Sequence, residues 1–193
     1  MMPLRALLPA FALALASICH AAPEPGDGYL VRLVDGENVV DERFAMVPTA
    51  SGTWIGFFYL ADEGRLVSSR CYDSVCQDAN DLTAPLSERG QYVSAAQRPA
   101  INRPIAAFYD AAAGALMALD CLTADCLYGF ERTLDDAGDV GQHTAIAVDP
   151  ASGLPLISYY DVDNARLKLY QCATAACDSG VASVVDATTG RGR

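Results

Sequence analysis

The chain has 193 residues, and its 24 acidic against 13 basic side chains give a formal net charge of −11. Such a charge repels phosphate backbones and anionic lipid, so neither nucleic acid nor a membrane surface is expected as a partner. One apolar run, within residues 6–18, is shorter than the ~20 residues that a membrane-spanning helix needs. No membrane insertion is therefore expected.

Residues 1–22 have the three-part pattern of a secretory signal peptide. A single arginine supplies positive charge, the apolar run follows it, and the alanines at 21–22 offer small residues for cleavage. Cys19 ends the apolar run and leaves a lipoprotein anchor as an alternative, although the branched Ile18 before it fits a lipidation motif badly. We expect a secreted or periplasmic protein whose signal peptide is cleaved, in preference to one anchored through Cys19.

After a Pro- and Gly-rich linker, residues 23–28, we expect one β-rich domain over residues 29–193. Tyr29–Val34 and residues 38–47 are β-prone runs on either side of Asp35–Gly36, which together are a hairpin signal. Tyr29–Val34 is also a candidate for a strand that completes a sheet begun near the C-terminus.

One supersecondary unit recurs every ~50 residues, in residues 39–88, 89–139 and 140–190. Each copy contains a pair of aromatic or large apolar residues, a leucine and a Cys-x4-Cys pair. The aligned positions are Phe58, Phe108 and Tyr159; Tyr59, Tyr109 and Tyr160; and Leu66, Leu116 and Leu167. The repetition indicates an architecture but not a reaction.

Each copy is expected to form four short strands, because β-prone runs alternate with turn residues such as those of Asp149–Gly153. The expected strands are residues 42–47, 54–60, 65–71 and a weaker one from 76 in the first copy; 91–97, 105–110, 115–121 and 126–133 in the second; and 142–148, 156–161, 166–172 and 181–186 in the third. Ala111–Leu119 has a helical composition, but its counterparts in the other copies do not, so a strand is expected there too.

Four antiparallel strands per repeat match the blade of a β-propeller, in which sheets pack face to face. The expected fold is an all-β, propeller-like array of about three blades, fewer than the roughly four to eight of a closed propeller. The array is then either incomplete or an open stack that self-associates through its open blade edges. Because successive strand residues face opposite sides, Tyr159 and Tyr160 should contact different neighbouring blades; a stacking site for sugar rings is the alternative.

Six of the seven cysteines lie beyond the signal peptide and form the three Cys-x4-Cys pairs. An even number of cysteines in an exported chain indicates disulfides, each closing a short hairpin turn and contributing roughly 2 kcal/mol. A metal site is the alternative, but zinc clusters favour tighter spacing with further Cys or His ligands. The expected disulfides are Cys71–Cys76, Cys121–Cys126 and Cys172–Cys177.

No motif in the sequence assigns a reaction, a cofactor or a metal. Asp161, Asp163 and Asn164 form a weak calcium candidate in a turn, but the other copies do not repeat it, which favours ordinary turn carboxylates. His143, the only histidine beyond the signal peptide, starts a strand, and no Gly-x-Ser-x-Gly elbow accompanies it. A structural role is therefore expected for His143, no catalytic residue is assigned, and no cofactor is expected.

The third copy carries the most distinctive motif, since His143–Asp149, Gly153–Asp161 and Leu167–Leu169 read HTAIAVD, GLPLISYYD and LKL. These residues resemble the blades of a group of bacterial secreted β-propeller-like repeat proteins. The second copy retains Pro104 and Phe108–Asp110, and the first mainly its aromatic residues and cysteines. Members of that group are largely uncharacterised, so the resemblance implies a fold and no activity.

The expected function is that of an exported, non-catalytic repeat module whose blade-edge loops bind a protein or a carbohydrate. A sialidase- or glycosidase-like hydrolase acting on surface glycans is an alternative, but no Ser-x-Asp-x-Gly-x-x-Trp box is present, and no third arginine is assigned beside Arg98 and Arg103. A further alternative is a truncated propeller without independent function, because the chain stops at Gly190–Arg193, where another blade would begin.

Cys172→Ser is expected to leave Cys177 as one additional free thiol per chain, because each cysteine pair closes its own hairpin. Thiol titration of the unfolded, non-reduced variant against the unsubstituted protein measures this number. More than one additional thiol would show that the pairs do not form independently.

Overall fold

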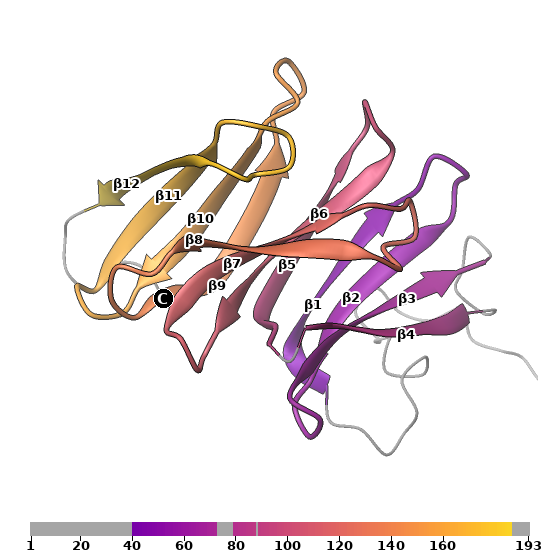
Figure 1. Cartoon of the computed structure of the whole chain (residues 1–193), viewed down its shortest axis with the longest axis horizontal. Coiled ribbons are helices and arrows are strands. Elements are labelled where there is room, and N and C mark those ends of the chain that lie inside the picture. Colours follow the sequence, from indigo (N-terminus) through magenta and orange to yellow (C-terminus); the bar gives the residue numbers. More distant parts are fainter. Residues whose placement is uncertain (1–39, 73–78, 88, 187–193) are drawn as a thin grey trace, which may run out of the picture.

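The computed structural model describes residues 40–72, 79–87 and 89–186, and every regular element in these ranges is a β-strand (Figure 1). Sheet 1 consists of β1 (Val40–Pro48), β2 (Trp54–Leu60), β3 (Arg65–Cys71) and β4 (Ala79–Ser87). Sheet 2 consists of β5 (Gln91–Arg98), β6 (Arg103–Asp110), β7 (Ala115–Cys121) and β8 (Gly129–Asp135). Sheet 3 consists of β9 (Val140–Val148), β10 (Pro155–Asp161), β11 (Arg166–Cys172) and β12 (Gly180–Asp186). The all-β class is thus confirmed, while the expected signal peptide, the linker, Tyr29–Val34 and Cys76 lie outside the described residues.

The strands of each sheet follow one another in an antiparallel meander, in the orders β1-β2-β3-β4, β5-β6-β7-β8 and β9-β10-β11-β12. The three sheets lie side by side in chain order, and the first strands of neighbouring sheets, β1 with β5 and β5 with β9, contact each other (Figure 1). Over the residues described above, the row of sheets is open and does not close into a ring.

The fourth strand of sheet 2 begins later than the sequence indicates, at Gly129 rather than Cys126. Cys126 has a φ of +56°, which is left-handed and incompatible with a continuing strand. Its N–H donates to Thr123 O at 3.1 Å, so this residue closes the hairpin turn before the ladder begins.

The segment of helical composition, Ala111–Leu119, contributes to β7 rather than to a helix. Every residue of β7 is buried, and its ladders with β6 and β8 satisfy its backbone groups on both sides. The helix preference of alanine, leucine and methionine is worth well under about 1 kcal/mol per residue. Burial between two sheets therefore outweighs local propensity here.

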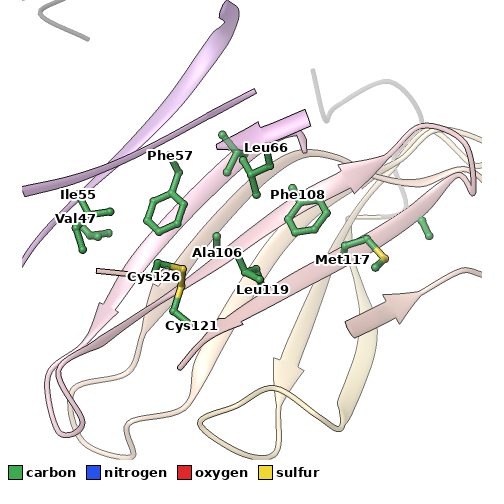
Figure 2. Close-up of a cluster of buried hydrophobic side chains, with 12 residues drawn as sticks. Val47, Ile55, Phe57, Leu66, Ala106, Phe108, Met117, Leu119, Cys121 and Cys126 are labelled. Carbon is green, nitrogen blue, oxygen red and sulfur yellow. A yellow bond between two sulfur atoms is a disulfide. The ribbon is translucent and has the colours of Figure 1, made fainter. Parts of the chain in front are cut away.

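A hydrophobic core fills the space between sheets 1 and 2 (Figure 2). Ile55 and Phe57 of β2 and Ala106 and Phe108 of β6 are fully buried in this cluster. The Cys121–Cys126 disulfide lies within the same cluster, so it adds apolar surface as well as closing its hairpin. Because fully burying a phenylalanine stabilises by roughly 1.5–3 kcal/mol, this contact binds the two sheets strongly to each other.

A second core lies between sheets 2 and 3. Ile105 and Ala107 of β6 pack with Ile157 and Tyr159 of β10, whereas the residues that alternate with them on β6 belong to the first core. This is the alternation that a strand imposes, and it makes sheet 2 apolar on both faces. Tyr159 therefore packs against a neighbouring sheet, whereas the ring of Tyr160 lies beside His143 of its own sheet.

Two glycines allow the first strands of sheets 2 and 3 to approach the preceding sheet closely. Gly90 has a φ of +143° and Gly141 a φ of +111°, a region that favours glycine. A Cβ atom at Gly90 would lie 2.7 Å from Leu66 Cβ, and one at Gly141 would lie 2.7 Å from Leu116 Cα. Backbone conformation and packing therefore both require glycine at these two positions. Gly90 thus lets the start of β5, and Gly141 the start of β9, lie close against the preceding sheet.

A buried arginine joins sheets 2 and 3 through polar contacts. Arg98 Nη1 lies 2.6 Å from Asp120 Oδ1 and donates to Ala175 O, in the disulfide hairpin of sheet 3, at 2.8 Å. Desolvation lowers the pKa of Arg98, and the hydrogen bond and charge of Asp120 oppose that shift. The remaining guanidinium donors bind the carbonyl oxygens of Arg103, Pro104 and Cys121.

Arg98→Met is expected to destabilise the protein by about 3–5 kcal/mol, because it leaves the Asp120 carboxylate buried without its counter-charge. The free energy of urea unfolding measures the loss. Arg103→Met is the control, since the Arg103 guanidinium makes an exposed 3.3 Å contact with Leu122 O and its removal should change stability by less than about 1 kcal/mol. Equal unfolding midpoints for the two variants would contradict the role given to Arg98.

Candidate functional site

The weak calcium candidate is a turn held by one buried carboxylate. Asp161 accepts hydrogen bonds from the backbone and side-chain nitrogens of Asn164, at 2.9 to 3.0 Å. Asp163 is exposed and accepts instead from the Asp139 N–H, in the connection that precedes β9. The three residues do not converge, and within the described ranges no group of three His, Cys, Asp or Glu residues is arranged to hold a metal ion.

The same turn in sheet 2 is held by Asp110, which is also buried. Its Oδ1 accepts from the N–H groups of Ala112 and Ala113 at 3.0 and 3.2 Å, and its Oδ2 lies 3.1 Å from Arg89 Nη1. Asp110 and Asp161 are therefore turn carboxylates, and both lie where the second strand of a sheet ends.

A hollow of about 190 Å³ opens beside Asp110, between sheets 1 and 2. Sheet 1 contributes Tyr59, at the end of β2, and Gly64 of the following turn. Sheet 2 contributes the start of β5 and the end of β6, so the close approach at Gly90 brings the two walls together. The lining residues from sheet 2 are Arg89, Gly90, Gln91, Tyr109, Asp110, Ala111 and Ala112.

A row of rings, which we call the aromatic row, leads from this hollow across to sheet 3. The ring of Tyr109 lies 6.1 Å from that of Tyr92, which lies 4.6 Å from the His143 ring. The His143 ring lies 6.3 Å from that of Tyr160 in an edge-on orientation. The row thus joins equivalent ends of sheets 2 and 3, with spacings typical of aromatic pairs.

The two central members of the row, Tyr92 and His143, occupy β-bulges with left-handed backbone. Their φ angles are +55° and +56°, and the ladders β5–β6 and β9–β10 shift register at these points. A bulge redirects a side chain, and a positive φ at a non-glycine residue costs about 1–3 kcal/mol. Both first strands therefore carry strain where they present a ring.

Hydrogen bonds hold the bulges and rings in place. Thr144, buried beside His143, has its hydroxyl 2.8 Å from Ser94 Oγ and bonds to Tyr92 O, so it ties β9 to β5. Tyr109 OH donates to Asp139 Oδ1 at 2.6 Å. Burial, and then this hydrogen bond to a carboxylate, raises the pKa of Tyr109, so its phenol remains protonated at neutral pH.

A separate cluster of buried polar side chains lies between sheets 2 and 3. Tyr159 OH and Lys168 Nζ both bind Asp135 Oδ2, each at 2.5 Å. Burial acts to raise the pKa of Asp135, but the hydrogen bonds from Lys168 and Tyr159 outweigh it and the pKa is lowered. Burial and the nearby carboxylate raise the pKa of Tyr159. The Tyr159 phenol, the Lys168 ammonium group and the Asp135 carboxylate thus meet between sheets 2 and 3, and all three side chains are largely buried.

The other residues noted in the sequence, His143, Arg98 and the cysteines, make contacts that hold the fold together. His143 is a bulge residue in the aromatic row, where its ring lies between those of Tyr92 and Tyr160. Arg98 is engaged by Asp120 and four carbonyl groups, so it is not free to bind an anionic sugar with Arg103. The Cys121–Cys126 and Cys172–Cys177 disulfides are present, and Cys71 is disulfide-bonded. Disulfides are consistent with an extracellular or periplasmic location.

Sequence reasoning did not find the hollow, although it noted the aromatic positions that border it. Tyr59 and Tyr109 were expected in blade packing, and Arg89 and Gln91 carried no motif. The one feature of the sequence that could have indicated the hollow is the pair Tyr109–Asp110, a tyrosine followed by a turn carboxylate at the end of a strand. Only the packing of sheet 1 against sheet 2 shows that Tyr59 joins them.

Lys168→Met is expected to move acid unfolding to higher pH, by roughly one pH unit, because it removes the strongest group that lowers the Asp135 pKa. A carboxylate with a depressed folded-state pKa stabilises the protein above its unfolded pKa of about 4, and that stability is lost as pH falls through the folded value. Circular dichroism against pH measures the midpoint.

The matched control is Lys168→Met combined with Asp135→Asn, in which no carboxylate titrates at this place. The shift should disappear in the double variant. An unchanged midpoint in Lys168→Met would contradict the role of Asp135 in acid stability.

Comparison of the sequence with known protein families and curated proteins assigns no family to the chain. No protein-family model matches the chain, and no curated protein matches it significantly. Over the described residues, the fold contains no helix that is long and apolar enough to cross a membrane. The chemistry of the hollow and of the aromatic row is therefore the basis for assigning a function.

Proposed function

We propose that the chain is an exported, non-catalytic binding module that holds a carbohydrate in the hollow between sheets 1 and 2. The observation that carries this proposal is the lining of the hollow, where two tyrosines, Tyr59 and Tyr109, lie with the polar side chains of Gln91, Arg89 and Asp110. Apolar ring surface beside a few convergent hydrogen-bonding groups is the usual construction of a small-molecule site.

The chemistry of the lining favours a sugar over other small molecules. Tyrosine offers an apolar ring face for the C–H groups of a pyranose together with a polar hydroxyl. Gln91 has both donors and an acceptor, and Arg89 has several donors, which suits the many hydroxyls of a sugar. Since Arg89 is already paired with Asp110, the hollow has no uncompensated positive charge to select a free anion.

The same lining argues against hydrolysis. Glycoside hydrolysis generally uses two carboxyl groups on opposite sides of the bond. Asp110 is the one carboxylate among the described residues that line the hollow, and it is held by two backbone N–H groups and Arg89. Tyr109 has a raised pKa, which is the opposite of what a phenolate nucleophile needs.

We further propose that the three sheets are blades of a propeller-like array. The support is the shared meander order, the head-to-tail packing of one sheet face on the next, and the contact between the first strands of neighbouring sheets. The resemblance of the third sequence copy to secreted β-propeller-like repeat proteins agrees with this arrangement and with export. In such an array the hollow lies at a blade edge, where loops present ligand sites.

Tyr59→Ala and Gln91→Ala are each expected to weaken sugar binding about tenfold, the loss for about 1.4 kcal/mol of stacking or hydrogen bonding. Titration calorimetry with chitotriose, cellotriose and sialyllactose measures binding to the oxidised protein. Tyr128→Ala is the control, because Tyr128 is 68 % exposed in the disulfide hairpin of sheet 2, at the opposite end of β7 from the hollow.

Mass spectrometry of each sugar after incubation separates binding from turnover. Binding without cleavage, lost in the hollow variants and retained in the control, supports the proposal. Cleaved sugar would favour a hydrolase instead, and equal affinity in Tyr59→Ala and the unsubstituted protein would remove the hollow as the site.

A further inference from the structure

The hollow between sheets 1 and 2 is too small to enclose a long ligand. Its volume is about 190 Å³, which is below the roughly 300–1,000 Å³ of sites that bury a drug-sized molecule. A sugar of several units must therefore extend beyond the hollow. The surface that borders the hollow decides the direction in which it extends.

The aromatic row begins at the hollow and supplies such a surface. Tyr109 lines the hollow and is the first ring of the row, and Gln91, which also lines it, is followed directly by Tyr92 in β5. The ring of Tyr92 lies 6.1 Å from that of Tyr109 and 4.6 Å from that of His143. The sheet 2 wall of the hollow thus continues to sheet 3 through neighbouring rings.

The two central residues of the row are accessible, whereas the two outer ones are buried. Tyr109 and Tyr160 are 6 % and 3 % exposed. Tyr92 and His143 are each partly exposed. A ligand that leaves the hollow therefore meets a tyrosine from sheet 2 and a histidine from sheet 3, placed side by side.

The backbone that presents these two rings is strained in the same way in both sheets. Tyr92 and His143 have φ angles of +55° and +56°. Each follows a glutamine that pairs with the tyrosine near the end of the second strand of its sheet, so the two residues occupy equivalent positions. Strained residues are concentrated at ligand sites. The recurrence of this strain at two accessible rings indicates a binding surface.

The charge beside the row is negative. Asp139, which is partly exposed, accepts a hydrogen bond from Tyr109 OH at 2.6 Å, and the exposed Asp163 accepts one from the Asp139 N–H at 2.9 Å. The positive charge of Arg89 in the hollow is paired with Asp110. In a chain of net charge −11, these carboxylates repel an acidic ligand.

We propose that the aromatic row is a second sugar subsite, and that the ligand is a non-acidic oligosaccharide that extends from the hollow across the rings of Tyr92 and His143. This inference rests on the proposed binding of sugar in the hollow, and it adds the length and the charge class of the ligand. Tyrosine and histidine each present an apolar body with a polar tip, which suits the C–H groups and hydroxyls of a pyranose. The subsite is complete only when sheets 2 and 3 are packed together.

Titration calorimetry with sugars of two lengths, cellobiose and cellotetraose and then chitobiose and chitotetraose, tests the subsite. In the unsubstituted protein the tetrasaccharide of the recognised series is expected to bind at least about tenfold more tightly than the disaccharide, which is about 1.4 kcal/mol. Tyr92→Gly and His143→Gly should each abolish this advantage, because each removes a ring while glycine adopts the left-handed backbone without strain. Tyr92→Phe keeps the ring and should retain the advantage.

Two further variants separate the row from the hollow. Tyr59→Ala should weaken both lengths alike, since Tyr59 lines the hollow. Tyr128→Ala should change neither affinity, because this exposed residue lies in the disulfide hairpin of sheet 2. Circular dichroism confirms the fold of each variant, and the comparison of lengths in the unsubstituted protein depends on no variant.

The possible results distinguish this inference from the proposed function. No binding of any sugar would overturn both. Equal affinity for the two lengths, with Tyr59→Ala still weakening them, would leave the hollow as the site and overturn the second subsite. Glycine variants that weaken both lengths equally would also overturn it, because the rings would then only support the hollow. Tetragalacturonate, an acidic tetrasaccharide, should bind more weakly than the uncharged one, and tighter binding would overturn the charge class.

Discussion

The structure depends on sheets that are buried on both faces. A four-stranded meander satisfies the backbone groups of its central strands, but each face still needs a partner to remove its apolar side chains from water. Sheet 2 obtains both partners, so all of β7 and all of β6 after Arg103 are buried, while β6 sends alternate residues into two different cores. The stability of any one sheet is therefore inseparable from its neighbours, and the molecule behaves as a stack rather than as three independent units.

Polar groups at the interfaces follow from the same burial. A charge placed between two sheets must find its counter-charge and further donors there, and Arg98 with Asp120 and Asp135 with Lys168 do so through multiple contacts. Such groups add little net stability over an apolar contact, but they are costly to mispair. They consequently fix the position of one sheet relative to the next. The hydrogen bond from Arg98 to the disulfide hairpin of sheet 3 contributes to that position.

The proposed ligand site arises where this packing ends. Beyond the last core residues of β2 and β6, the side chains of Tyr59, Gln91 and Arg89 line a hollow between the two sheets. Bulges at Tyr92 and His143 place further rings at the same end of the sheets, at an energetic cost of about 1–3 kcal/mol each. The strained backbone, the aromatic rings and the polar groups thus lie together where β2 and β6 end. The disulfides lie at the opposite ends of the strands, in the hairpins that follow β7 and β11.

The sequence by itself determined the all-β class, most strand positions and the pairing of the cysteines in two of its three hairpins, because these are properties of neighbouring residues. Alternation, turn chemistry and short Cys-x4-Cys spacing act within a single hairpin, so they can be read locally. The beginning of β8 at Gly129 was missed, since the left-handed backbone of Cys126 is set by the closed turn. Only the tertiary structure decided that Tyr59 joins Tyr109 across an interface, that Arg98 reaches Ala175, and that the ring of Tyr92 lies beside that of His143. Each of these depends on which sheet faces which, a relation between residues far apart in the chain that no local pattern encodes.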